Sequence, residues 1–241
     1  MKNKRYYVNK EIIEGSHIKL EGDEFIHLAS VMRSRVGESV TLFNGDAYDY
    51  DGVIVEIAKK YALINVTHKT KGIGFPNKKV TLFQALVKGD KLSTIVQKNT
   101  ELGTHEIVLF ESDYSDVKVG SKNIEKLEKV SISACKQCGS SVLTLTGREL
   151  KFNQMIEEIK KYDSVLFAFE CESENHISKI LPSLRDKNNI AVIVGAEGGF
   201  SDIEAQKIKD AGAIVVNLGQ RILRAETAGI VLPSLVILGA N

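Results

Sequence analysis

The chain has 241 residues, 43% hydrophobic and 26% charged, which is enough for one large domain or two small ones with an ample core. Its formal net charge of +1 at pH 7 does not indicate a nucleic-acid partner, although a local patch or a dimer can concentrate cations. No apolar run approaches the roughly 20 residues of a membrane span, the basic start lacks the apolar stretch of a signal peptide, and the three cysteines are expected to be reduced thiols of a cytoplasmic protein.

Residues 1–70 are expected to form a small barrel-like domain. Several β-rich runs fill this part, one of them entering an Asn44-Gly45 turn that is typical of a hairpin. One helix is expected over 23–37, with Phe25, Leu28, Val31 and Met32 at helical spacing and Gly37 as its stop. The polar stretch 69–79, with two glycines and a proline, is the candidate linker.

Residues 78–241 are expected to form an α/β domain. Strands and helices alternate here, which favours a parallel sheet with helices on both faces. In such sheets ligands bind beyond the carboxyl ends of the strands. Three strand ends carry unusual residues, namely Phe167–Glu170, Gly195–Gly199 and Leu218–Glu226.

The stretch "GAEGGFSDIE", residues 195–204, is a glycine-rich turn from a strand into a helix. It fits neither a Walker loop nor G-x-G-x-x-G. A carboxylate, Glu197, stands where a phosphate would bind and would repel a pyrophosphate. S-adenosylmethionine suits the loop better, because it carries a sulfonium and no phosphate. The competing structural interpretation is that Ser201 and Glu204 form a capping box and the glycines only turn the chain.

The stretch "LGQRILRAETA" places Arg221, Arg224 and Glu226 at a strand-to-helix junction. One interpretation is a surface Arg–Glu pair. The other is that two arginines beside a small-cofactor site face an anion such as RNA phosphate. The apolar helix from 225 to 238 is explained by a dimer interface or by the core, and we favour the dimer.

Together, "VGAEGGFS" and "LGQRILRAETA" resemble the RsmE-type family of ribosomal RNA methyltransferases in the SPOUT superfamily. Residues 84–103, 27–33 and 42–45 also resemble family stretches, so the resemblance covers essentially the whole chain. It implies a PUA-like N-terminal RNA-binding β-barrel and a C-terminal SPOUT domain with a parallel sheet and a trefoil knot. It also implies a homodimer that methylates N3 of a specific uridine in 16S rRNA of the small ribosomal subunit.

The resemblance implies the cofactor residues, and the catalytic and RNA-contacting residues are our own candidates from the sequence. The cofactor S-adenosylmethionine would be bound by Phe169, Glu170, Gly195, Ala196, Glu197, Gly198, Leu218, Gly219, Ile222 and Leu223. Uridine N3 must lose its proton, and Arg224 would stabilise the resulting anion with Glu226 holding the guanidinium. RNA phosphates would contact Arg5, Arg33, Lys88, Lys91 and Lys98. The lysines have surface alternatives, and Lys98 could simply pair with Glu101.

This chain departs from the family pattern at several positions. Alanine stands at 196 and 225 where proline and threonine are usual, "DYSDVK" from Asp113 replaces an Arg-Ser-Val-Val-Lys run, and Lys136–Ser140 is altered. These changes keep open a non-catalytic RNA-binding or ribosome-assembly protein, and a third alternative is an unrelated nucleotide-binding enzyme. Cys135 and Cys138 are expected to be buried thiols with no metal, and His27 to be structural or an RNA-stacking residue.

Overall fold

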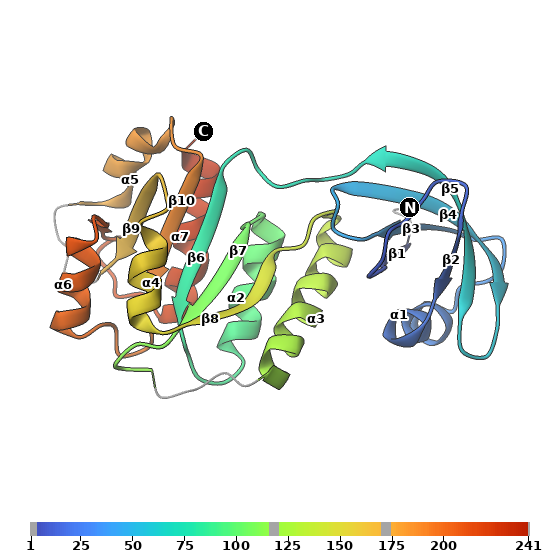
Figure 1. The fold of residues 1–241 in the computed structure, drawn as a ribbon, viewed down its shortest axis with the longest axis horizontal. Helices are drawn as coiled ribbons and strands as arrows, with labels where there is room; N and C mark the ends of the chain where they lie inside the picture. The colour runs from blue at the N-terminus through green and yellow to red at the C-terminus, as the bar shows by residue number, and fades with distance from the viewer. Residues whose placement is uncertain (1–3, 116–120, 170–174, 241) are drawn as a thin grey trace. The chain divides into compact units, whose positions relative to one another are not determined.

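The structure is a computed structural model that describes residues 4–115, 121–169 and 175–240. Two compact units divide it (Figure 1): Met1–Gly74 with Cys135–Leu143, and Phe75–Ala134 with Thr144–Asn241. The sequence predicted domains over 1–70 and 78–241, and did not predict that a short later segment belongs with the first unit. Within the described residues, no helix combines the length and apolarity needed to cross a membrane.

The first unit is built on a curled five-stranded sheet in the order β1-β3-β4-β5-β2. Its strands are β1 (Lys4–Tyr7), β2 (His17–Leu20), β3 (Ser39–Phe43), β4 (Tyr48–Ile57) and β5 (Ala62–Lys71). The pair β1 and β3 is parallel, and the other pairs are antiparallel. Tyr6, Leu42 and Tyr50 are almost fully buried among aliphatic side chains, so the inner face of the sheet holds the core.

The helix expected over 23–37 is shorter and changes its winding. It consists of α1 (Gly22–Ile26) and the π-helical turn η1 (His27–Val31), which ends before Arg33 at φ +47°. Leu28 is buried, but Val31 and Met32 are exposed, so the predicted apolar stripe is wrong at its end. A π turn takes more residues than an α turn, and it rotates later side chains off the face computed for 3.6 residues per turn.

The second unit has a six-stranded sheet in the order β11-β9-β10-β6-β7-β8, with every pair parallel. Its strands are β6 (Lys79–Ala85), β7 (Glu106–Phe110), β8 (Leu145–Leu150), β9 (Ser164–Ala168), β10 (Asn189–Val194) and β11 (Ile214–Val216). Successive β10 residues Val192 and Ile193 are both buried but belong to opposite cores. This two-sided burial explains the continuous apolar run, and the predicted parallel sheet is confirmed.

Helices cover both faces of that sheet (Figure 1). One face carries α2 (Lys91–Leu102), α3 (Ser121–Cys138), α5 (Ile177–Ile180), η2 (Leu181–Leu184) and α7 (Ala225–Gly239). The other carries α4 (Phe152–Ile159) and α6 (Asp202–Asp210). Helix α7 buries Leu232 and Val236 against the sheet, and Gly229 O accepts a hydrogen bond from Asn99 Nδ2 at 2.9 Å. The chain's own core therefore accounts for one face of α7.

The predicted linker 69–79 is only partly a linker. Strand β5 continues to Lys71 and β6 begins at Lys79. Lys78 is 6% exposed, and its Nζ donates hydrogen bonds of 2.9 Å to the carbonyls of Leu184, Arg185 and Lys187. A charged residue in a polar stretch is thus buried, because backbone carbonyls satisfy all of its donors.

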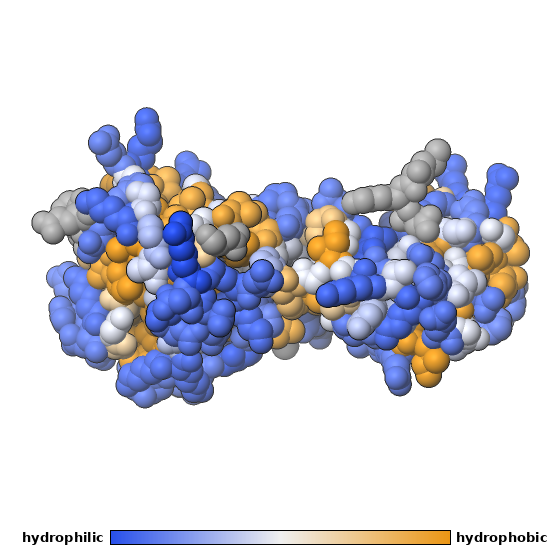
Figure 2. Space-filling view, turned by 90° about the horizontal axis from the view of Figure 1, so that it is seen from above, coloured by the Kyte–Doolittle hydropathy of each residue, from blue (hydrophilic) through white to orange (hydrophobic). Residues whose placement is uncertain are grey.

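The face displayed in Figure 2 is mostly hydrophilic, with hydrophobic residues reaching the surface in separate patches. Single exposed apolar residues are normal for a folded chain. Two of the most exposed large apolar residues lie in the second unit, where Ile222 is 82% exposed and Leu238 is 69% exposed. Ile222 lies between β11 and α7, and Leu238 lies near the end of α7.

Candidate functional site

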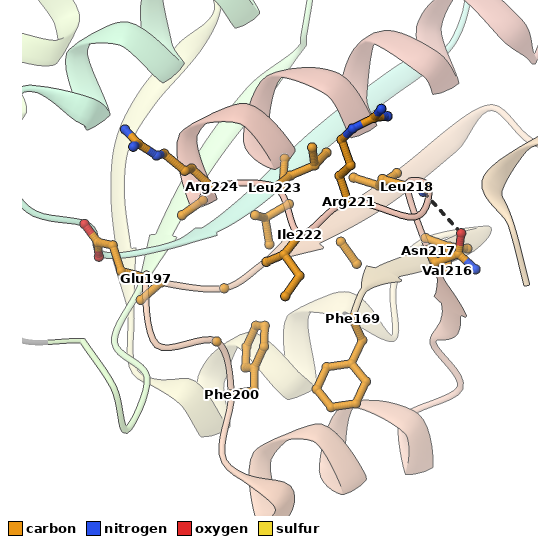
Figure 3. A pocket seen from close by; sticks show the side chains of 18 of the residues that line it. Phe169, Glu197, Phe200, Val216, Asn217, Leu218, Arg221, Ile222, Leu223 and Arg224 are labelled. Carbon is orange, nitrogen blue, oxygen red and sulfur yellow. Dashed lines mark hydrogen bonds between the residues drawn. The ribbon is translucent and has the colours of Figure 1, made fainter. Parts of the chain in front are cut away.

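A pocket of about 430 Å³ opens at the carboxyl ends of three adjacent strands (Figure 3). Ala168, Val194 and Val216, at or near the ends of β9, β10 and β11, line it. The loops that follow these strands supply the rest of the wall. The pocket therefore lies where parallel α/β sheets bind ligands, and where the sequence placed its three unusual strand ends.

Most of the predicted cofactor residues meet in this pocket. It is lined by Phe169, Gly195, Ala196, Glu197, Leu218, Gly219, Ile222 and Leu223, together with Arg224 and Lys91. Gly198 and Glu226 do not line it, and Glu170 lies outside the described residues. The predicted loops did not include Phe200 and Asn217, which also line the pocket, whereas Gln220 and Arg221 lie within the predicted loop 218–224. The proximity of Phe200 and Asn217 in sequence to the named loops was the available signal.

Two positions in the 195–199 loop require glycine, each for a different steric reason. A Cβ on Gly195 would lie 2.8 Å from the Phe200 ring, and Gly199 has φ +70°. Phe200 stacks on Phe110 and meets Phe167 edge-on, with ring centroids 6.1 and 5.0 Å apart. The loop therefore wraps tightly over an aromatic cluster that belongs to the sheet.

The helix after the loop begins with the capping box that the sequence predicted. Ser201 Oγ accepts a hydrogen bond from Glu204 N at 3.3 Å, and Glu204 Oε2 accepts one from Ser201 N at 3.1 Å. Glu204 is 4% exposed, and its other oxygen accepts from Asp113 N at 2.9 Å. These residues start α6 and anchor a neighbouring loop, so their structural interpretation is confirmed.

Glu197 joins the glycine loop to the start of α2. Its Oε1 accepts hydrogen bonds from Lys91 Nζ at 2.6 Å and from Lys88 N at 3.2 Å. Partial burial pushes the pKa of the Glu197 carboxyl up, but the Lys91 ammonium and backbone amides outweigh it, so the pKa is lowered. The pocket wall therefore carries an ionised carboxylate, and Lys91 is engaged with it instead of facing an RNA phosphate.

Lys91 also reaches the start of α7. Its Nζ lies 3.8 Å from Glu226 Oε2, an oxygen that is buried and accepts no hydrogen bond. Arg224 is the exposed N-cap residue of α7 and lines the pocket. Among the described residues the ion pair of Glu226 is thus with Lys91. No ion pair between Glu226 and Arg224 occurs among the described residues, so the predicted hold of Glu226 on the Arg224 guanidinium stays a prediction.

One side of the pocket is apolar and the other cationic. In Figure 3 the Ile222 side chain points toward the rings of Phe169 and Phe200, while Arg221 and Arg224 point away from those rings. Phe169 stacks on Phe167 with centroids 5.2 Å apart, and Lys209 Nζ lies 5.2 Å from its centroid. This arrangement fits a flat apolar heterocycle on one side and an anionic group on the other.

The remaining predicted RNA contacts separate into two groups. Arg5 is committed to the first unit, because it forms a bidentate pair with Asp49 at 2.7 and 2.9 Å and its side chain is 10% exposed. Lys98 Nζ pairs with both oxygens of Glu101 at 2.8 and 2.9 Å, as its surface alternative required. Arg33 is exposed, and Lys88 reaches the site through its backbone amide.

The altered segment Lys136–Ser140 belongs to the first unit. Lys136 Nζ pairs with both Glu24 oxygens at 2.9 Å and lies 3.3 Å from His27 Nδ1. Burial first, and then the Lys136 charge, lower the pKa of His27, whose ring meets Tyr6 edge-on. These contacts favour the structural interpretation of His27.

The two cysteines that can be described are free thiols. Cys135 is buried and its Sγ donates to Val142 O at 3.2 Å, while Cys138 is half-buried. No group of His, Cys, Asp and Glu suited to a metal occurs among the residues described. The prediction of buried thiols is confirmed for Cys135, whereas Cys138 is only partly buried.

Two family models match the chain, an RNA methyltransferase domain over residues 75–237 and an RNA methyltransferase PUA domain over residues 20–67. The chain therefore belongs to the RNA methyltransferase family. The particular resemblance to RsmE-type enzymes is also confirmed, since relatives named ribosomal RNA small subunit methyltransferase E match nearly end to end. The one from Rickettsia conorii is 31% identical and the match covers 95% of this chain and 93% of the relative. The one from Bacillus subtilis is 27% identical over 93% and 92%.

Solved structures agree. A methyltransferase from Legionella pneumophila, in complex with bound cofactor SAM, has a TM-score of 0.89 and 28% identity over 98% of this chain and 97% of that one. A ribosomal RNA small subunit methyltransferase E from Neisseria gonorrhoeae, bound to S-adenosyl methionine, has a TM-score of 0.88 and 25% identity over 96% and 95%.

Proposed function

We propose that this chain transfers a methyl group from S-adenosylmethionine to N3 of a specific uridine in 16S rRNA of the small ribosomal subunit. The observation that carries the proposal is the pocket at the ends of β9, β10 and β11, with the ionised Glu197 in its wall. A carboxylate there disfavours phosphate and favours a sulfonium. The SAM-bound relatives, which match 98% and 96% of this chain, support the same cofactor.

The residues present fit that cofactor. Phe169, Phe200 and Ile222 would hold the adenine on the apolar side of the pocket. Gly195, Gly199 and Gly219 line the pocket and have no side chain, so their main chain could hydrogen-bond the sugar and the amino-acid part. When bound, the cofactor supplies an electrophilic methyl group on its sulfonium.

Arg224 would act on the uridine, and Lys91 would position the carboxylates beside it. Arg224 lines the pocket with its guanidinium exposed, where it can stabilise negative charge on the base as N3 loses its proton. Lys91 pairs with Glu197 of the 195–199 loop and with Glu226 of α7, so it ties that loop to the start of α7. Positioning of the methyl group in line with N3 would provide much of the rate.

The substrate base has to leave its helix or be unpaired. N3 lies on the Watson–Crick edge, which a paired uridine does not expose. Arg33 and Arg221 are exposed and would contact phosphates of the RNA strand. Such a substrate would place the protein in the cytoplasm, with the ribosome.

A homodimer and a trefoil knot are part of the proposal. The outer face of α7 carries half-buried Ile230 and Val231 and the exposed Leu238, an apolar face that a second copy would cover. For the knot, support comes from the chain order, since α7 follows the edge strand β11 yet packs on the central strands β6 and β10. Sedimentation tests the dimer, and an experimental trace through 169–175 tests the knot.

Methyl transfer to small subunits that lack the modification is the direct test. We expect calorimetry to show tight binding of S-adenosylmethionine and weak binding of ATP or NAD, and nuclease mapping to place the methyl group at a uridine N3. Cofactor binding without transfer to any subunit preparation would favour the assembly-factor alternative. Tight ATP or NAD binding would favour the unrelated nucleotide enzyme.

A further inference from the structure

Tyr114 is an exposed aromatic residue fixed beside the pocket loop. Its side chain is 51% exposed, in a chain where most aromatic residues are buried or packed. It lies in the stretch "DYSDVK" that follows β7. We propose that Tyr114 is a substrate-contacting residue that stacks on an unpaired base of the RNA, a role that rests on the proposed function.

The ring is held against the glycine loop. A Cβ on Gly198 would lie 3.0 Å from Tyr114 Cβ and 3.4 Å from its Cγ, so the missing side chain at 198 is what lets Tyr114 approach. The neighbours Glu197 and Gly199 line the pocket. Tyr114 thus stands one residue away from the pocket wall.

The backbone around Tyr114 is anchored on both sides. Asp113 N donates to Glu204 Oε1 at 2.9 Å, and Asp113 Oδ2 accepts from Ser201 Oγ at 2.7 Å. Ser115 N donates to Ser112 O at 2.9 Å, and the two serine hydroxyls lie 2.9 Å apart. An exposed aromatic side chain on a fixed turn loses little conformational entropy when it binds a flat partner.

The chemistry of the RNA substrate indicates which group Tyr114 would contact. An unpaired pyrimidine presents two apolar ring faces, and stacking on an aromatic side chain does not require a particular base. The arginines of the pocket supply charge for phosphates, and Tyr114 is the one exposed aromatic residue among the described residues of the second unit. Loss of one stacked base costs roughly 5- to 150-fold in affinity.

Enzyme kinetics on small subunits are the first test. Tyr114→Ala should raise KM for the subunits by roughly 5- to 150-fold and leave the cofactor Kd and kcat at saturating RNA nearly unchanged. Tyr114→Phe, which keeps the ring, should restore the wild-type KM. An unchanged KM for Tyr114→Ala overturns the proposal, as does a Tyr114→Phe variant as poor as the alanine one.

Fluorescence gives a second readout that does not need methyl transfer. The chain has no tryptophan, so Tyr114→Trp introduces the sole indole. Single-stranded oligouridine should quench it, whereas an abasic strand of equal length or S-adenosylmethionine alone should not. Leu145→Trp is the matched control, because Leu145 is 52% exposed at the amino end of β8, away from the strand ends that form the pocket.

The two readouts separate failure of this inference from failure of the proposed function. If wild-type protein transfers no methyl group, quenching by oligouridine but not by the abasic strand still supports base stacking at position 114. Equal quenching by both strands, or none in that case, overturns it. An emission shift on dilution without RNA assigns the ring to a contact between copies and overturns it too.

Discussion

The charges of the second unit's pocket and those of the first unit's sheet serve different ends. In the pocket, Lys91 connects Glu197 and Glu226, and Arg224 remains exposed. In the first unit, Arg5 and Asp49 form a mostly buried bidentate pair within the fold. The same residue types thus give an open cationic site in one place and closed structural pairs in the other.

The difference shows what identifies a functional cation. Arg5 and Arg224 look alike as isolated letters, but Arg224 follows a glycine-containing loop at a strand end, whereas Arg5 lies inside a strand. A strand residue has other strands of its sheet within reach, and Arg5 of β1 pairs with Asp49 of β4, two strands along the sheet. A loop residue beyond a parallel strand faces the ligand crevice.

Arg224→Ala is the change with the largest expected effect. Unchanged methyl transfer in this variant would contradict the functional role that separates Arg224 from Arg5. Loss of a preorganised charge at the developing anion should lower kcat by about 100- to 1000-fold, with little change in the cofactor Kd. Methyl transfer under saturating substrates measures it. Arg221→Ala is the control, expected mainly to raise KM for RNA, and equal kcat losses in the two variants would contradict the assigned role.

Arg5→Ala should act on stability. Removing the guanidinium leaves the carboxylate of Asp49 largely buried without its partner, which costs about 3 kcal/mol in the free energy of unfolding. Denaturant unfolding followed by circular dichroism measures the loss, and calorimetry should show unchanged cofactor affinity. A double variant, Arg5→Leu with Asp49→Leu, should recover part of the stability because no unpaired charge remains. A stable Arg5→Ala protein that has lost RNA affinity would restore the phosphate contact predicted from sequence.

Lys91→Met should loosen the pocket through the two carboxylates. A misplaced loop lowers kcat/KM by roughly 10- to 100-fold. Since the pKa of Glu197 is lowered in the folded protein, its ionised form supports the wild-type site above the carboxyl's ordinary pKa and is lost only as pH falls through the lowered value. In the variant, burial remains while the ammonium is gone, so cofactor affinity should fall at a higher pH.

Calorimetric titration of cofactor binding from pH 7 downward checks that shift. Lys91→Arg, which keeps the charge, is the control and should stay close to wild type. If the methionine variant had the same pH profile as the wild type, Lys91 would not be what holds the Glu197 carboxylate ionised.

Sequence reasoning reached the pocket because glycine-rich strand ends carry a backbone signal. The parallel sheet, the capping box of Ser201 and Glu204, and the meeting of the three loops all followed from local patterns. The features that the sequence did not predict depend on residues far away along the chain. The burial of Lys78 depends on carbonyls about a hundred residues later, and the partner of Glu226 comes from α2. The π turn at His27 likewise has no periodic signal, so Val31 was placed inside.

Lys98→Ala should have the smallest effect, and it tests whether an exposed ion pair on α2 has any role in RNA binding. Lys98 pairs with Glu101 on the surface of α2, with its side chain 43% exposed. Exposed pairs three residues apart contribute under about 0.5 kcal/mol, so unfolding and methyl transfer should both stay near wild type. The salt dependence of RNA binding decides between the two interpretations, because loss of a phosphate contact reduces the slope by about one counterion. An unchanged slope leaves Lys98 a surface residue, and a reduced slope would return it to the RNA path.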